Sequence, residues 1–244
     1  MSTYRREHYL AKLRPFYNDS GLIKVITGIR RCGKSSLLIT VLNELFEQGI
    51  PETNLIYLNL DRREYRNVTT PDQLDQLIEQ AMSNAYGAGL RYLFIDEVQN
   101  VKGFETVING WREEGNCSIF ITGSNSYLLS GELATKLTGR YIKLEMFTLS
   151  FQEYLGMRNF LNKPEIPVSQ AFRDYLTYGG FPKSLNMTIP TKKPHIFKTS
   201  SGRSSTRTSP PTKKYAIAIL SPVCRTISSI ISQRPQIFPA LSRI

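Results

Sequence analysis

A glycine-rich stretch near the N-terminus combines residue types that bind phosphate. An apolar run, residues 22–26, precedes it, and an amphipathic helical pattern with an apolar stripe from Leu37 to Phe46 follows it. In this context, glycines, a lysine and a hydroxyl predict a loop whose backbone N–H groups hold phosphates. The lysine would reach the β and γ phosphates and the hydroxyl would bind Mg²⁺. The loop and its flank read Gly28-Ile29-Arg30-Arg31-Cys32-Gly33-Lys34-Ser35-Ser36.

A second stretch, Arg91–Glu97, is a short apolar run that ends in two adjacent carboxylates. Ligands of open parallel sheets bind at the carboxyl ends of the strands. We expect Lys34 to pair with phosphates, Asp96 to hold Mg²⁺ directly or through a water, and Glu97 to polarise the attacking water. One more predicted strand, residues 54–60, lies between the two motifs in the chain. This spacing is typical of P-loop ATPases that insert a strand between their two phosphate-site strands.

Further polar residues are candidates for the same chemistry. Ser124 or Asn125 could bond the γ-phosphate or the water, or form only a strand-to-helix turn. Arg140 could stabilise transition-state charge from the same subunit or from a neighbour, or form a surface salt bridge. Arg30 and Arg31 could contact phosphate, a neighbouring subunit or only solvent. We predict Glu97, Lys34, Ser124 and Arg140 as catalytic residues, Ser35 and Asp96 as metal ligands, and residues 28–36 as the nucleotide-binding loop.

The elements that must position these residues alternate between strand and helix. This alternation predicts βαβ units and an α/β fold, a mainly parallel five-stranded sheet flanked by helices. From residue 150 to residue 175 the pattern is helical, with Ser150 as an N-cap and Glu153 three residues later. The predicted strands cover residues 22–26, 54–60, 91–97, 117–122 and 140–144, and helices are predicted after the loop, from Thr70, over residues 104–111 and over residues 128–137.

Charge and composition narrow the function class. The 244 residues carry a net charge of +11, but all 20 acidic residues lie within residues 1–174 together with 20 of the 31 Lys and Arg. The excess is therefore confined to the C-terminal part, which weakens an argument for nucleic-acid binding by the rest. Three widely spaced cysteines fit a reducing compartment, and no run of 18 apolar residues occurs. We expect a cytoplasmic protein without a membrane partner.

Several motifs taken together resemble a prokaryotic AAA-like ATPase family over residues 1–185. The resemblance implies an ATP-binding core with Mg²⁺, Walker A and Walker B motifs, and sensor-like roles for Ser124 and Arg140. The residues that carry it are the loop at 28–35, Phe94-Ile95-Asp96-Glu97-Val98-Gln99, Thr122-Gly123-Ser124-Asn125, Leu137-Thr138-Gly139-Arg140, Leu149-Ser150-Phe151-Gln152-Glu153-Tyr154 and Tyr178-Gly179-Gly180-Phe181-Pro182.

The C-terminal part departs from the family pattern. Members of the family continue into a domain of unknown function that looks nuclease-like, and nothing here resembles it. Ser, Thr, Pro, Lys and Arg dominate while acids vanish, so we expect a disordered or frameshifted tail. The predicted organisation is an ATPase core over residues 1–148, a helical lid over 149–189 and the tail over 190–244.

Two function classes follow. The first is a Mg²⁺-dependent ATPase whose hydrolysis drives a conformational change, with a homo-oligomer as an open possibility. The second is a nucleotide-dependent switch or DNA-binding module with little hydrolysis, suggested by Arg30, Arg31 and the basic tail. An inactive, truncated ATPase is a further possibility if the C-terminal part cannot fold.

Overall fold

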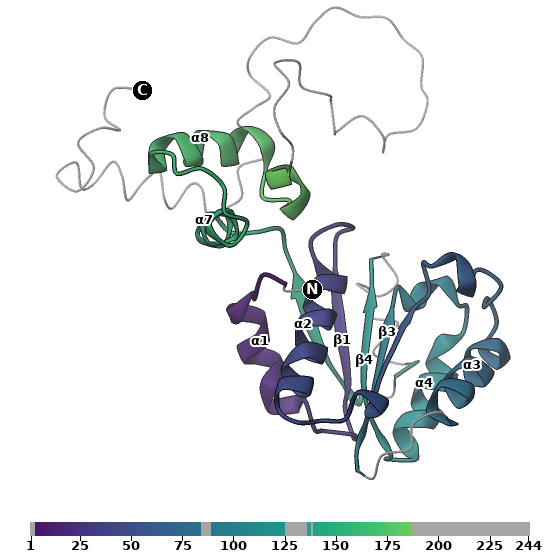
Figure 1. Ribbon diagram of the computed structural model, residues 1–244. Helices are drawn as coiled ribbons and strands as arrows, with labels where there is room; N and C mark the ends of the chain where they lie inside the picture. Colours follow the sequence, from purple (N-terminus) through teal and green to yellow (C-terminus); the bar gives the residue numbers. More distant parts are fainter. Residues whose placement is uncertain (1–2, 84–88, 125–135, 138, 187–244) are drawn as a thin grey trace, which may run out of the picture. The chain divides into compact units, whose positions relative to one another are not determined.

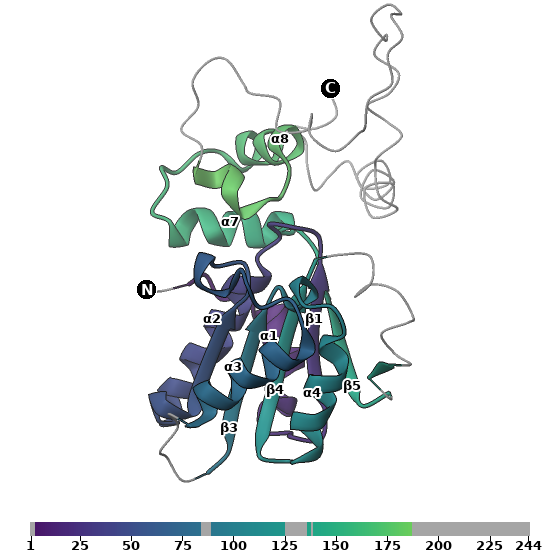
Figure 2. The ribbon, with the colours of Figure 1, turned by 90° about the vertical axis from the view of Figure 1, so that its right-hand side faces the viewer.

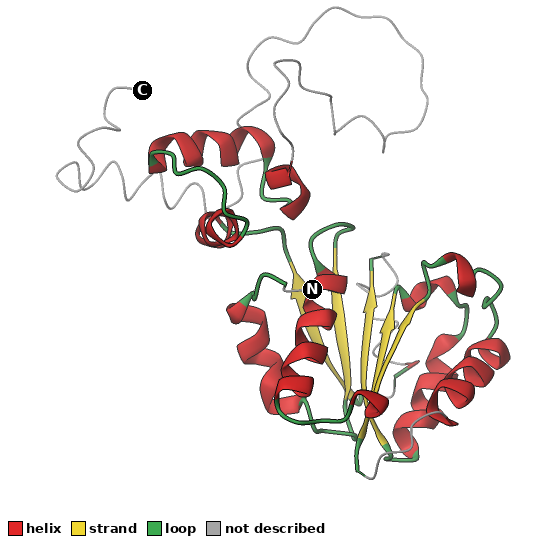
Figure 3. Cartoon of the chain, in the orientation of Figure 1, coloured by secondary structure: helices red, strands yellow, loops and turns green. Residues whose placement is uncertain are grey.

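The computed structural model describes residues 3–83, 89–124, 136–137 and 139–186, which belong to the unit Met1–Pro190. Strands and helices alternate along this unit (Figures 1 and 3). The strands are β1 (Ile23–Gly28), β2 (Leu55–Asn59), β3 (Arg91–Asp96), β4 (Cys117–Gly123) and β5 (Tyr141–Met146). The α-helices are α1 (Glu7–Leu13), α2 (Lys34–Glu47), α3 (Pro71–Ser83), α4 (Phe104–Glu113), α7 (Phe151–Phe160) and α8 (Val168–Tyr178), with short 3-10 helices at Arg14–Phe16, Glu52–Asn54, Arg63–Tyr65, Val98–Asn100 and Pro182–Asn186.

The five strands form one parallel sheet in the order β2-β3-β4-β1-β5. The predicted α/β class and all five predicted strands are confirmed. As predicted, β2 lies between the two motifs in the chain, but it lies at the edge of the sheet. The strand inserted between β1 and β3 is β4, which pairs with both.

Helices cover both faces of the sheet, with α1 and α2 on one face and α3 and α4 on the other (Figure 1). Figure 2 is seen from the side of α3 and α4, which lie in front of the sheet. Two apolar clusters reflect these layers, since successive side chains of a strand point to opposite faces. Phe94 and Phe120 stack with ring centroids 4.8 Å apart in the cluster that contains the α2 stripe. Leu93 and Ile119 belong to the cluster that contains Leu74 of α3. Strands β1 and β4 are buried along their whole length, as expected for the centre of a parallel sheet.

Local signals in the sequence define several helix boundaries. Gln73 accepts from the Thr70 N–H while the Thr70 hydroxyl accepts from the Gln73 N–H, so a capping box begins α3. Ser150 and Glu153 form the second predicted capping box, at the start of α7. One residue of the predicted α2 stripe is wrong, because the Phe46 side chain is 57% exposed.

The helices after β5 have a small apolar cluster of their own, built on Leu149, Tyr154, Ala171 and Leu185. Two hydrogen bonds to the backbone of Leu149 fold this segment back on itself. Its N–H donates to the Gly180 carbonyl (2.7 Å), and its carbonyl accepts from the Tyr175 hydroxyl (2.8 Å).

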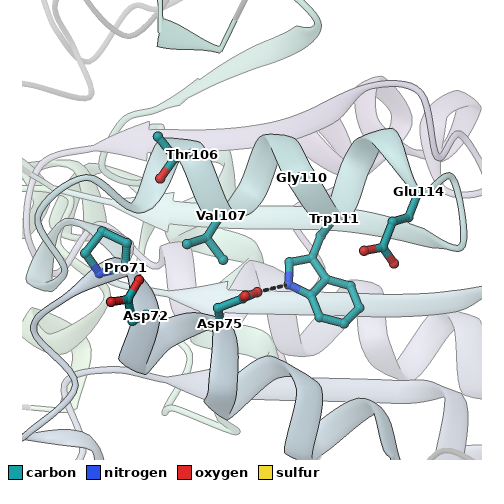
Figure 4. A pocket seen from close by; sticks show the side chains of 8 residues that line it. All are labelled: Pro71, Asp72, Asp75, Thr106, Val107, Gly110, Trp111 and Glu114. Atoms are coloured by element: carbon teal, nitrogen blue, oxygen red, sulfur yellow. Dashed lines mark hydrogen bonds between the residues drawn. The ribbon is translucent and has the colours of Figure 1, made fainter.

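A cavity of about 280 Å³ lies between α3 and α4, on the face of the sheet opposite α2 (Figure 4). Trp111 is half-buried here, with its indole N–H donating to the Asp75 carboxylate (2.7 Å). None of the predicted site residues lines this cavity. Its lining residues are Pro71, Asp72, Asp75, Thr106, Val107, Gly110, Trp111 and Glu114.

Some predictions concern residues outside the described ranges. These are Asn125, most of the helix predicted over residues 128–137, and the tail over residues 190–244. Among the described helices, none is both long enough and apolar enough to cross a bilayer.

Candidate functional site

The glycine loop connects the end of β1 to the start of α2 and requires left-handed backbone at three positions. These are Gly28 (φ 146°), Arg31 (φ 69°) and Gly33 (φ 110°). A Cβ on Gly28 would lie 2.2 Å from the Met146 carbonyl oxygen of β5, so only glycine fits there. The Cys32 N–H donates to the Ile29 carbonyl (3.3 Å) and closes the turn. The loop therefore presents the N-terminus of α2 at the carboxyl edge of the sheet.

Lys34 is the first residue of α2, and its side chain is only 3% exposed. Its ammonium donates to the carbonyls of Gly28 (3.1 Å) and Ile29 (3.3 Å). The same Nζ lies 3.9 Å from Glu97 Oε1. The lysine of the first motif and the second carboxylate of the other motif thus meet at one place.

Asp96 ends β3 and is 1% exposed, with hydrogen bonds to both carboxylate oxygens. Oδ2 accepts from the Tyr57 hydroxyl (3.0 Å) and the Asn59 amide (3.4 Å), and Oδ1 accepts from the Thr122 hydroxyl. Burial, followed by the charge of Asp96, raises the pKa of Tyr57 well above its ordinary value, so the phenol remains a donor. Strands β2 and β4 therefore fix the orientation of this carboxylate from both sides.

Glu97 follows in left-handed backbone (φ 57°), which turns its side chain toward the glycine loop. Its N–H donates to the Thr122 hydroxyl (3.1 Å), so one threonine holds both acidic residues in place. Its Oε2 accepts from the Ser124 hydroxyl (2.9 Å) and from the Gln99 amide. Ser124, predicted as a site residue, is thus brought into contact with Glu97.

Ser35 and Asp96 offer the hard oxygen donors that Mg²⁺ prefers. Ser35 is half-buried beside Lys34 on the first turn of α2, and a carboxylate with three hydrogen bonds retains acceptor capacity for a metal-bound water. No cluster of three or more His, Cys, Asp or Glu that could hold a metal occurs among the described residues. Ser35 and Asp96 can therefore supply part of the oxygen coordination that a Mg²⁺ ion needs.

The other predicted residues are placed differently. Four residues of the loop are exposed, namely Ile29, Arg30, Arg31 and Ser36. The Arg30 guanidinium lies 3.8 Å from the Asp61 carboxylate, and both side chains are exposed to solvent. Cys32 is fully buried, and burial raises the pKa of its thiol. The loop thus combines an exposed outer edge with a cysteine that packs into the core.

Arg140 is not brought to the site within its own chain. It is exposed and precedes β5, whose other end, Met146, pairs with Gly28. Six residues of parallel strand span roughly 20 Å. The expectation that Arg140 acts on the phosphates of its own subunit is therefore wrong, because the parallel register puts it at the opposite edge of the sheet.

An arginine that the sequence did not single out supports the glycine loop. Arg6 is 6% exposed and binds both carboxylate oxygens of Glu153 at 2.8 Å. Its guanidinium also donates to the carbonyls of Cys32 (3.2 Å), Phe147 (2.9 Å) and Thr148 (3.2 Å). Arg6 thus ties the loop to the beginning of α7. The one signal in the sequence was Glu153, the acidic residue of the capping box at α7, which can form an ion pair with a basic side chain.

Comparison with known proteins places this site in a family. The model of a family described as AAA domain matches residues 20–155. This range contains the glycine loop, both carboxylates, Ser124 and Arg140.

Two curated relatives are uncharacterized proteins. One, from Haemophilus influenzae, is 41% identical over 188 residues, which are 77% of this chain and 46% of that protein. The other, from Methanocaldococcus jannaschii, is 35% identical over 182 residues, covering 72% of this chain and 39% of that protein. The chain spans less than half the length of either relative.

Similar solved structures include a Walker-type ATPase of Pyrococcus abyssi (TM-score 0.51, 19% identity, 75% of this chain and 65% of that one). The Aeropyrum pernix ORC1 protein in complex with DNA has a TM-score of 0.52 at 15% identity, with 76% and 58% coverage. DnaA from Aquifex aeolicus bound to AMPPCP has a TM-score of 0.50 at 16% identity, with 75% and 59% coverage. At these identities the likeness shows the fold alone.

Proposed function

Because the chain belongs to this family of AAA domains, we propose that it binds ATP with Mg²⁺ and hydrolyses the bond between the β and γ phosphates. One observation carries the proposal, the convergence of Lys34 and Glu97. Their charged atoms lie 3.9 Å apart at the carboxyl edge of the sheet, next to buried Asp96. A lysine at a helix N-terminus, a metal-binding carboxylate and a carboxylate base are the groups that phosphoryl transfer to water requires.

The glycine loop would hold the phosphates. Residues 28–36 would surround them, with backbone N–H groups and the N-terminus of α2 directed at the negative charge. Lys34 would exchange its contacts with the Gly28 and Ile29 carbonyls for the β and γ phosphate oxygens. Because the Lys34 ammonium is already buried, the exchange requires little further desolvation.

Ser35 and Asp96 would hold the metal, Ser35 through its hydroxyl and Asp96 through a water or directly. When bound, Mg²⁺ would neutralise charge on the β and γ phosphates. Tyr57, Asn59 and Thr122 would keep the Asp96 carboxylate oriented toward that position.

Glu97 would accept a proton from the attacking water, and Ser124 would keep its carboxylate aimed at the loop. A sensor-like contact of Ser124 with the γ-phosphate is compatible with its half-buried position. Arg140 would act only on a neighbouring subunit of a homo-oligomer, because it lies at the far edge of its own sheet.

The segment over residues 149–189 would respond to the nucleotide as a helical lid. Two contacts support this role. Arg6 links the Cys32 carbonyl to Glu153 of α7. Gly33 approaches Pro182, since a Cβ on Gly33 would lie 4.0 Å from Pro182 Cγ. A movement of the loop on phosphate binding would therefore be transmitted to the helices of this segment through these two contacts.

Two variants test the proposal. Lys34→Ala should abolish nucleotide binding or hydrolysis, because the loop loses its only lysine. Glu97→Gln should keep ATP affinity but slow turnover about 100-fold or more, because the amide cannot accept the proton. ATP affinity and phosphate release with Mg²⁺ are the measurements. Unchanged turnover in both variants would refute an ATPase site at this place.

The second candidate is a nucleotide-dependent switch or DNA-binding module with little hydrolysis. Exposed Arg30 and Arg31 beside the glycine loop favour it, as does the fold that the chain shares with ORC1 solved on DNA. It predicts a salt-dependent affinity for DNA that survives deletion of residues 190–244. If the affinity for DNA disappears when residues 190–244 are deleted, the positive charge of the tail is incidental to the function of the glycine-loop site. Steady ATP turnover by the chain would also argue against an inactive, truncated ATPase.

A further inference from the structure

Gln99 lies two residues after Glu97, in the 3-10 turn Val98–Asn100, and contacts the Glu97 side chain. Its amide Nε2 donates to Glu97 Oε2, the same oxygen that accepts from the Ser124 hydroxyl. An ionised carboxylate has only acceptors. The amide nitrogen of Gln99 must therefore be the group in contact with Glu97, which leaves the carbonyl oxygen outside this contact.

That carbonyl oxygen is buried and, within the described part of the chain, has no hydrogen-bond partner. A buried acceptor without a donor is destabilising, because its hydrogen bond with water is lost on folding and not replaced. Next to a carboxylate, such an atom can accept a hydrogen bond from a water or from a donor that arrives with the substrate. Since the nitrogen and oxygen share one planar amide, the oxygen lies within roughly 5 Å of the carboxylate, a span that a single water bridges.

The turn that carries Gln99 is held rigidly. Val98 and Val101 on either side are buried, at 0% and 1% exposure. Asn100 donates from its backbone to the Glu97 carbonyl (3.1 Å) and from its side chain to the Leu60 carbonyl (3.1 Å). A side chain on such a turn loses little further entropy when it orders a ligand.

We propose that Gln99 positions the attacking water together with Glu97, an inference that rests on the proposed ATPase function. The amide N–H fixes the Glu97 carboxylate, and the buried carbonyl oxygen accepts a hydrogen bond from the water. The water oxygen forms the new bond to the γ-phosphorus while the bond to the β–γ bridging oxygen breaks. One water proton passes to Glu97 and on to the released phosphate. The other stays on the attacking oxygen, which becomes part of that phosphate, and is hydrogen-bonded to the Gln99 carbonyl oxygen.

Gln99→Leu tests this role, because leucine has a similar volume but neither donor nor acceptor. Single-turnover hydrolysis of ATP with Mg²⁺ should slow about 10- to 100-fold, while affinity for a non-hydrolysable ATP analogue remains unchanged. Gln76→Leu, at an exposed glutamine of α3, is the matched control and should leave both quantities unchanged. If the leucine variant fails to fold, Gln99→Asn replaces it in the same measurements, because its side chain is one methylene shorter and moves the amide away from Glu97.

A double-mutant cycle separates positioning from a structural role. Because Gln99 acts through Glu97 and its water, Gln99→Leu should have little further effect in a Glu97→Gln background. Full, multiplicative slowing in that background would overturn the inference, as would loss of analogue affinity. Full activity of Gln99→Leu beside an inactive Glu97→Gln would overturn it and leave the ATPase proposal intact. If the unmodified chain shows no hydrolysis, both proposals fail.

Discussion

Lys24 is fully buried in β1, and replacing it should change how stability depends on pH. Its ammonium donates to the carbonyls of Asp19 (2.6 Å) and Leu22 (2.9 Å) and to the Ser118 hydroxyl (2.7 Å). It also lies 4.7 Å from the centre of the Phe120 ring. Burial lowers the pKa of Lys24 from 10.5 to about 8, and the charge of Asp19 offsets only part of this.

The direction in which the unfolding free energy changes with pH depends on the protonation of Lys24 in the folded and the unfolded chain. Below about pH 8 the amine is protonated in both the folded and the unfolded chain, and stability carries the full cost of a buried charge. Between about pH 8 and pH 10.5 the folded chain releases its proton while the unfolded chain keeps it, so stability rises with pH. One pKa unit corresponds to about 1.4 kcal/mol, so the total gain is roughly 3 kcal/mol, of which about 2 kcal/mol falls between pH 8 and pH 10.

The assay is urea unfolding of the unmodified chain and Lys24→Met at several pH values, with the difference in unfolding free energy plotted against pH. Groups without an electrostatic interaction with Lys24 cancel in this difference. Cys117 does interact with Lys24, but burial raises its pKa to about 11, above the range from pH 8 to pH 10. Lys12→Met, at an exposed lysine, is the matched control for the loss of one charge. A difference that changes by less than about 0.5 kcal/mol from pH 8 to pH 10 would refute the reasoning.

Three further predictions concern the site. Arg6→Met should lower the unfolding free energy by about 3 kcal/mol in urea, because it leaves Glu153 without its ion pair. Gly28→Ala should cost more than about 2 kcal/mol, because the methyl group would meet a β5 carbonyl at 2.2 Å; Gly110→Ala, which meets nothing within 4 Å, should be neutral or stabilising in the same unfolding assay. Thr122→Val should cost about 1–3 kcal/mol and weaken Mg²⁺-dependent ATP binding, because two site residues lose a hydrogen-bond partner. Unchanged urea midpoints in the Arg6, Gly28 and Thr122 variants would contradict the contacts described.

Patterns formed by residues close together in the sequence were enough to predict much of the fold. The five apolar runs are all strands, although β1 continues to Gly28 rather than ending at Ile26. Both capping boxes were predictable, since the partners lie three residues apart and bond within one turn. The glycine loop was predictable for the same reason, because its backbone conformation and its helix N-terminus are local properties.

Contacts between distant residues were decided by the tertiary structure. The strand order put β4 rather than β2 between the two motifs, and so supplied Thr122 to both Asp96 and Glu97. The parallel register put Arg140 at the far edge of the sheet, and the fold brought Arg6 to the loop.

The sequence by itself therefore determined which residues could bind phosphate and metal, because residue type and local backbone conformation carry that chemistry. Only the tertiary structure determined that Lys34 and Glu97 meet and that Gln99 faces them with a buried acceptor. The physical reason is that crossover connections between parallel strands leave no periodic signal in the chain, while they decide which strand ends lie side by side.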